Sequence, residues 1–149
     1  MPMKKFTKHV LRSKKKPFDE RIDSIKQKGL TSIMGELNSR WYFSDFVSKN
    51  PDIVEGINEM VIQTSVDGYI AATIAVRDFD LSAQLDKIST PILLITGSGD
   101  QATPLSEAKF IASKIKKAKL SIVEGASHLA IVEKPSEFDG FLYDFLENQ

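Results

Sequence analysis

The chain has 149 residues, 42% hydrophobic and 27% charged, which is typical of a globular domain or of part of a larger one. Its 20 basic and 20 acidic residues cancel, so the overall charge favours neither nucleic acid nor an anionic membrane as a partner. The absence of cysteine excludes disulfides and thiolate metal sites, and two histidines are too few to suggest a zinc site. We therefore expect no metal and no cofactor.

Residues 1–18 are predicted to form a basic N-terminal tail. Seven lysines and arginines and no acidic residue occur in residues 1–16, a pattern typical of a solvated, mobile segment. A nucleic-acid or membrane contact is the alternative, but aromatic residues are confined to Phe6 and Phe18, so we expect neither partner. No apolar run could span a bilayer and no secretory signal is evident, which predicts a cytoplasmic location.

Residues 19–80 are predicted to be entirely helical. Asp19 and Glu20 suit a first helical turn, and Gly29 suits a helix end. Pro51 is tolerated at the first position of a later helix. Asp67-Gly68 is expected to interrupt the helical pattern. The expected helices cover residues 19–29, 30–37, 44–49, 51–62 and 69–76.

The pattern changes after residue 80. The short, wholly apolar run at 91–95 predicts a strand buried on both faces of a parallel sheet. A helix is expected at 104–116, a second strand at 119–123 and a final helix at 135–147. This order is a βαβ crossover followed by one more helix. The fold class is therefore α/β, and residues 81–149 form a core segment.

Two polar side chains follow the two predicted strands. Asp100 lies in the loop 97–104, and His128 lies in the loop 124–129. Loops at the carboxyl ends of neighbouring parallel strands meet, so a carboxylate there can fix the tautomer of a histidine that acts as a general base. Taken alone, Asp100 is explained as a turn or helix-capping residue and His128 as an ordinary histidine. Together, in the order Asp then His, they favour the acid and base of a hydrolase triad.

Ser98 and Ser127 lie in the same two loops and are candidates for a local nucleophile. Neither occurs in a G-x-S-x-G turn from strand to helix, so we interpret both as small loop residues.

The pattern G-x-x-D-x-x-T-P at residues 97–104 and G-x-S-H-L at residues 125–129 resembles the C-terminal part of the α/β-hydrolase family. Within it the likeness is greatest to the 3-oxoadipate enol-lactonases and covers about residues 18–149. The segments that carry this likeness are Glu20–Ile25, Ser39–Phe43, Gly68-Tyr69, Ala75–Asp80 and Glu133–Pro135.

The resemblance implies a partial α/β-hydrolase fold, in which a helical cap at 19–80 precedes the last two parallel strands and helices of the core sheet. It implies that Asp100 is the triad acid and His128 the triad base. Arg40 and Trp41 match a cap segment that contacts the carboxylate and ring of the substrate; the alternatives are a surface charge or ion pair for Arg40 and cap core for Trp41. Arg77 and Asp78 are expected to form a structural pair.

In this family the nucleophile elbow and the oxyanion loop precede the cap, and the first 17 residues match neither. We therefore expect the C-terminal portion of a lactone or carboxylic ester hydrolase that is inactive alone. The expected partners are an N-terminal hydrolase half in trans, or a second copy bound through the exposed sheet edge, with a small ester or lactone as substrate. A non-catalytic binding or interaction module derived from a hydrolase is the alternative.

Overall fold

The computed structural model describes the backbone of residues 4–148 and the side chains of residues 15–148. The expected contacts of the basic tail therefore lie largely outside the described residues and stay a prediction. The chain forms two compact units. The first combines the residues up to Gly35 with Glu55–Asp80, and the second combines Glu36–Val54 with the residues from Leu81 on. The segment predicted as a cap thus contributes to both units.

The first unit is helical. Its elements are α1 (Lys4–Lys28), the 3₁₀ helix η1 (Leu30–Ile33), α5 (Val66–Asp78) and most of α4 (Pro51–Ile62). Helix α1 packs against α5, and Ile22 and Ile25 are buried. Helix α1 stops at Gly29, whose φ of 74° is left-handed and whose N–H bonds to the carbonyl of Ile25 at 2.8 Å. The predicted helix end at this glycine is confirmed.

Two helix starts differ from the prediction. Helix α1 begins at Lys4 rather than near Asp19, and it continues through Pro17. Lysine and arginine have high helix propensity, so a basic segment extends a helix readily. Helix α5 begins at Val66, because the Ser65 hydroxyl caps it by accepting the Gly68 N–H at 3.3 Å. Gly68 therefore lies in the first turn of α5. The prediction that Asp67-Gly68 interrupts the helical pattern is wrong.

An ion-pair network joins α1 to α5. The Arg77 guanidinium lies 2.8 Å from Asp78 and 2.6 Å from Asp19, and Lys15 lies 2.7 Å from Asp78. The hydrogen bond from Arg77, helped by Lys15, lowers the pKa of Asp78 to about 2. The predicted Arg77–Asp78 pair is present. Because these groups are largely exposed, the network contributes little to stability.

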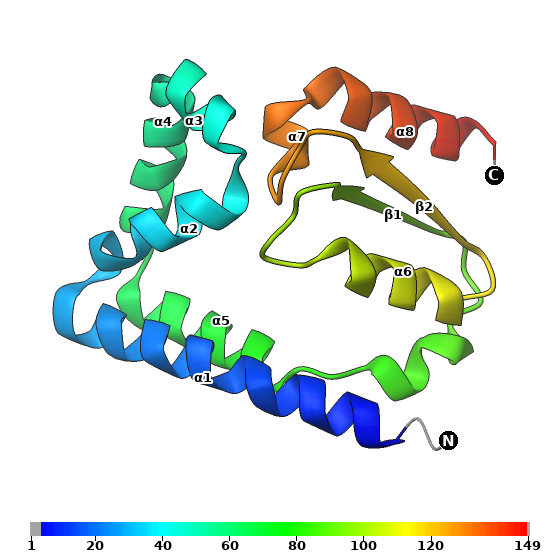
Figure 1. Cartoon of the computed structure of the whole chain (residues 1–149), viewed down its shortest axis with the longest axis horizontal. Helices are drawn as coiled ribbons and strands as arrows, with labels where there is room; N and C mark the ends of the chain where they lie inside the picture. The colour runs from blue at the N-terminus through cyan, green and yellow to red at the C-terminus, as the bar shows by residue number, and fades with distance from the viewer. Residues whose placement is uncertain (1–3, 149) are drawn as a thin grey trace. The chain divides into compact units, whose positions relative to one another are not determined.

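The second unit is built on two parallel strands, β1 (Ile92–Gly97) and β2 (Ala118–Val123), in register from Ile92 opposite Ala118 to Gly97 opposite Val123. Helices α6 (Leu105–Lys114) and α8 (Pro135–Glu147) lie on opposite sides of this sheet (Figure 1). The predicted βαβ crossover with one further helix is confirmed. The core consists of Val123, Ala126 and Ala130, with Ile95, Phe138 and Phe141 packed against them. The remaining elements are the end of α2 (Met34–Trp41), α3 (Ser44–Lys49), the 3₁₀ helix η2 (Ser82–Lys87) and α7 (Ala130–Glu133).

The prediction that the first strand is buried on both faces is wrong in one respect. Residues 92–95 are only half-buried, and burial is complete only at Thr96 and Gly97. Within the described residues the sheet has two strands, so the edge of β1 that faces away from β2 has no strand partner. The side chains of β1 therefore lack neighbours on that side and are only half-buried.

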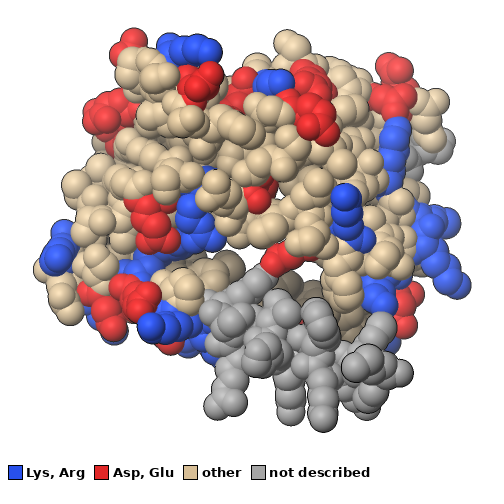
Figure 2. Space-filling view, in the orientation of Figure 1, with Lys and Arg blue, Asp and Glu red and all other residues tan. Residues whose placement is uncertain are grey.

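Acidic and basic side chains are interspersed on the face of the molecule seen in Figure 2. None of the helices in the described part of the chain is long and apolar enough to cross a bilayer. Among the described side chains, no group of three or more histidines and carboxylates lies close enough together to hold a metal ion.

Candidate functional site

The loops that follow β1 and β2, which we call the acid loop (97–104) and the histidine loop (124–129), lie against each other. Both strands end at the same level of the sheet, since Gly97 pairs with Val123. The Ser98 N–H bonds to the Val123 carbonyl and the Gly99 N–H to the Ala126 carbonyl, each at 3.0 Å. A Cβ atom on Gly97 would lie 2.2 Å from the Ser127 carbonyl oxygen, so only glycine permits this approach.

Asp100 and His128 are hydrogen-bonded across these loops. The Oδ2 atom of Asp100 lies 3.0 Å from Nδ1 of His128. The Asp100 side chain is 4% exposed, whereas that of His128 is 33% exposed. The predicted meeting of the two side chains is confirmed, and their catalytic role stays a proposal.

Asp100 also organises its own loop. Its Oδ1 atom accepts the N–H groups of Ala102 and Thr103, both at 2.8 Å, and its Oδ2 atom accepts the Thr103 hydroxyl at 2.8 Å. Asp100 therefore stabilises the turn and pairs with His128 at the same time, because different lone pairs of its carboxylate accept the two sets of hydrogen bonds.

The carboxylate is held in its ionised form. Burial raises the pKa of Asp100, but hydrogen bonds from His128 and Thr103 outweigh burial and hold the pKa below its usual value. An ionised carboxylate only accepts hydrogen bonds, so Nδ1 of His128 must carry the proton. In the neutral imidazole, Nε2 then has the free lone pair that a general base needs.

The two loop serines are engaged in local contacts. The Ser127 hydroxyl, in a residue 2% exposed, donates to the carbonyls of Arg40 and Gly99 at 3.0 and 3.3 Å. The Ser98 hydroxyl accepts the Gly125 N–H at 3.0 Å. These contacts favour the interpretation of both residues as small loop residues over that of a nucleophile.

The end of α2 lies beside both loops. The guanidinium of Arg40 donates to the carbonyls of Gln101 and Ala102 at 3.3 and 3.5 Å and pairs with Glu36 at 3.3 Å. The backbone carbonyl of Trp41 accepts the Leu129 N–H at 3.0 Å. The ion pair considered for Arg40 is present, and a contact of Arg40 or Trp41 with substrate stays a prediction.

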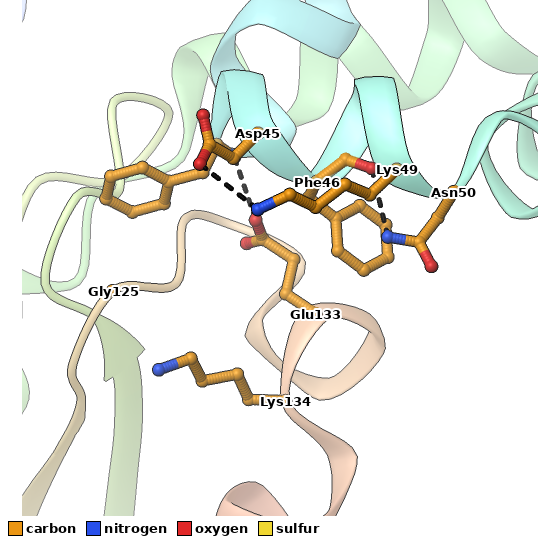
Figure 3. Close-up of a pocket in the computed structure, with 8 residues that line it drawn as sticks. Asp45, Phe46, Lys49, Asn50, Gly125, Glu133 and Lys134 are labelled. Carbon is orange, nitrogen blue, oxygen red and sulfur yellow. Dashed lines mark hydrogen bonds and ion pairs between the residues drawn. The ribbon is translucent and has the colours of Figure 1, made fainter.

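Sequence reasoning assigned no role at the site to Glu133 or to the side chain of Thr103. Glu133, at the end of α7, accepts the Ser127 N–H on Oε2 at 2.5 Å and the Phe43 N–H on Oε1 at 2.8 Å. Figure 3 shows its carboxylate directed from α7 toward α3. The Glu-Lys-Pro motif, placed five residues after His128, was the signal for it. The Thr103 hydroxyl lies 3.3 Å from Nδ1 of His128. The Thr-Pro pair that ends the acid-loop motif was the sequence feature that pointed to Thr103.

A pocket of about 280 Å³ borders the Glu133 side chain (Figure 3). Its charged groups have partners within the chain. Lys49 pairs with Asp45 at 3.3 Å, and Lys134 donates to the Glu124 carbonyl. The lining residues are Phe43, Asp45, Phe46, Lys49, Asn50, Gly125, Glu133 and Lys134.

Comparison with known proteins places this arrangement in a family. Residues 72–148 match the α/β-hydrolase family model described as TAP-like protein. The chain is 33% identical over 119 residues to 3-oxoadipate enol-lactonase 2 of Acinetobacter baylyi. This alignment covers 80% of this chain and 44% of that protein. It is 26% identical over 131 residues to 3-oxoadipate enol-lactonase 1 of the same organism, with 88% and 49% covered.

Solved structures agree. The enol-lactonase from Burkholderia xenovorans superimposes with a TM-score of 0.85 at 24% identity, covering 88% of this chain and 50% of that one. A hydrolase from Pseudomonas aeruginosa superimposes with a TM-score of 0.83 at 32% identity, covering 89% and 50%. The chain spans about half the length of these relatives. It belongs to the α/β-hydrolase family and has a partial α/β-hydrolase fold similar to that of the enol-lactonases.

Proposed function

We propose that this chain is the C-terminal portion of a hydrolase that cleaves a lactone or a carboxylic ester, and that it supplies the acid and the base of the triad. The observation that carries the proposal is the 3.0 Å contact between Asp100 and His128 at the ends of adjacent parallel strands. The buried, ionised carboxylate and the partly exposed imidazole have the accessibility that their roles require.

The proposal implies a sequence of proton transfers. Nε2 of His128 takes the proton of an attacking hydroxyl, and the imidazolium that forms is stabilised by Asp100 through the Nδ1–H bond. The same Nε2 proton then passes to the alkoxide oxygen that leaves the ester or lactone. Water then attacks the acyl-enzyme in the same way. His128 takes a proton from this water and passes it to the nucleophile oxygen, which releases the acid product and restores the free hydroxyl.

The nucleophile and the oxyanion donors, in this proposal, come from polypeptide outside these 149 residues. The sequence contains no G-x-S-x-G, and the hydroxyls of Ser98 and Ser127 are occupied in the loops. The pair alone could activate water, but the loss of oxyanion donors typically lowers the rate by about 10²–10³-fold. We therefore expect little hydrolysis by this chain alone.

The substrate class is supported by the relatives, whose names describe enol-lactonases. Within the proposal, residues 19–80 act as a cap, Arg40 contacts a substrate carboxylate and Trp41 contacts a substrate ring. The Arg40 side chain is 31% exposed, and a guanidinium has five N–H donors, so donors remain for a carboxylate beyond those used in the acid loop.

Complementation tests the proposal. The full chain is mixed with an N-terminal hydrolase segment that carries a nucleophile elbow, and hydrolysis of an enol-lactone and of p-nitrophenyl esters is measured. We expect the mixture to exceed the sum of the two parts, His128→Ala to abolish the gain and His9→Ala to preserve it. Equal rates for the mixture and the separate parts, with association of the two verified, would contradict the proposal.

A non-catalytic interaction module is the second candidate, and an exposed apolar surface favours it. On α8, Leu142, Tyr143 and Leu146 are 37%, 64% and 59% exposed. Large exposed apolar side chains in one helix are typical of a contact surface. A stable, monodisperse homo-oligomer in light scattering, unchanged by His128→Ala, together with failed complementation, would favour this function.

A further inference from the structure

We infer that Glu133 is a positioning residue, which sets the orientation of the His128 ring by joining the histidine loop to residues 40–43. The inference rests on the proposed function, because it gives His128 the role of the base. It adds a residue that does not touch the acid–base pair and acts through the backbone beside it.

Both residues that flank His128 in the chain are held by residues 40–43. On one side, the Ser127 hydroxyl donates to the Arg40 carbonyl at 3.0 Å. On the other side, the Leu129 N–H donates to the Trp41 carbonyl at 3.0 Å. The backbone on either side of the imidazole is therefore fixed by a segment almost 90 residues earlier in the chain.

Glu133 completes this connection with one carboxylate. Oε2 accepts the Ser127 N–H at 2.5 Å, and Oε1 accepts the Phe43 N–H at 2.8 Å. The short helix α7 fixes Glu133 relative to the histidine loop, because the Glu133 N–H bonds to the Leu129 carbonyl at 3.0 Å. The histidine loop, α7 and residues 40–43 thus form a closed set of contacts around His128.

The chemistry requires a carboxylate. Two backbone N–H groups face the two oxygens, and hydrogen bonds to an ionised acceptor are shorter and stronger than neutral ones. A glutamine would present one oxygen and one NH₂ group, so one backbone N–H would face another donor. The ring of His128 has few other constraints, since its side chain is 33% exposed and the contacts described for it are with Asp100 and Thr103 at Nδ1.

Nuclear magnetic resonance of the ring nitrogens tests this in the full 149-residue chain, without any assay of activity. The sequence has only two histidines, so His9→Ala leaves the His128 ring as the single signal. Two variants are compared in that background. Glu133→Gln removes the bridge, and Glu137→Gln makes the same chemical change on α8, where Glu137 contacts Lys134 at 3.9 Å.

We expect the parent chain and the Glu137→Gln control to show His128 predominantly as the Nδ1–H tautomer. In Glu133→Gln we expect the ratio of the Nδ1–H to the Nε2–H tautomer to fall by about tenfold. This change corresponds to the net free energy of roughly one hydrogen bond. A Glu133→Gln spectrum identical to that of the parent would overturn the inference and leave the proposed function intact. Absence of the Nδ1–H tautomer in the parent itself would overturn both.

Amide exchange in the unsubstituted chain provides a second measurement that holds even if Glu133→Gln does not fold. The amides of Ser127 and Phe43 lie outside helices and strands, so their protection depends on Glu133. We expect both to exchange at least about tenfold more slowly than in an unstructured peptide. Exchange at the unprotected rate in the folded chain would overturn the inference.

Discussion

Replacing Asp100 by asparagine should reverse the tautomer of His128. The oxygen of the new amide can keep the two backbone N–H bonds that Oδ1 accepts from Ala102 and Thr103. Its NH₂ group then occupies the Oδ2 position, 3.0 Å from Nδ1 of His128. Because that group only donates, Nδ1 must become an acceptor and the ring proton must move to Nε2, where it blocks general-base catalysis.

We expect Asp100→Asn to lower activity strongly and stability only slightly. A histidine held in the wrong tautomer costs about 10⁴-fold in kcat in serine proteases, and we expect a comparable loss in the complemented enzyme. Stability should fall by about 1–3 kcal/mol. The two backbone N–H bonds keep an acceptor, though a neutral one, and the contacts with Thr103 and His128 survive with the new NH₂ group as the donor. Asp100→Ala leaves four donors without an acceptor and should cost at least about 3 kcal/mol.

Three measurements check this reasoning. Ring-nitrogen resonance reports the tautomer, complemented ester hydrolysis reports kcat, and urea unfolding followed by fluorescence of Trp41, the single tryptophan, reports stability. An Asp100→Asn chain that keeps the proton on Nδ1 would refute the argument. So would an Asp100→Ala chain as stable as Asp100→Asn, because the carboxylate would then not be satisfying the four donors.

The same carboxylate predicts a dependence of stability on pH. Its pKa in the folded chain lies below the usual value, so its contribution to stability is complete above the unfolded-state pKa and is lost as the pH falls through the folded-state pKa. Urea unfolding of the parent chain and of Asp100→Asn should therefore converge in acid. A difference between the two chains that stays constant through the acid range would contradict the linkage.

Two further substitutions test packing. Gly97→Ala would place a Cβ atom 2.2 Å from the Ser127 carbonyl oxygen, and Gly99→Ala would place one 2.5 Å from the Phe43 ring. A ring at the end of a side chain can move but a backbone cannot, so we expect Gly97→Ala to cost about 3 kcal/mol or more in urea unfolding and Gly99→Ala about 1 kcal/mol. Equal costs would contradict this. Tyr42→Phe removes a buried hydroxyl that has no partner among the described residues, so it should stabilise the chain by about 1 kcal/mol. Burial raises the pKa of Tyr42 to about 12, so the parent, unlike the variant, should lose stability between about pH 10 and 12.

The residues that could be assigned from sequence are those whose signal is local. The apolar run at 91–95 is too short for a typical helix and is followed by glycines, and these features are enough to predict a strand and the turn after it. Asp100 and His128 each follow such a strand, so the rule that parallel strands end at one edge is enough to predict that the two residues meet. The helix end at Gly29 was predicted for the same reason, because one left-handed residue determines it.

Tertiary structure alone decided what joins segments far apart in the chain. The Glu-Lys-Pro motif draws attention to Glu133, but it does not indicate that the two carboxylate oxygens bind the backbone of Ser127 and of Phe43, which lies 90 residues away. The start of α1 at Lys4 was missed because Asp19 looks like a first-turn residue, whereas the helix continues through Pro17. Periodicity and capping rules describe contacts within one element, and the orientation of the His128 ring depends on hydrogen bonds between elements, which only the folded chain specifies.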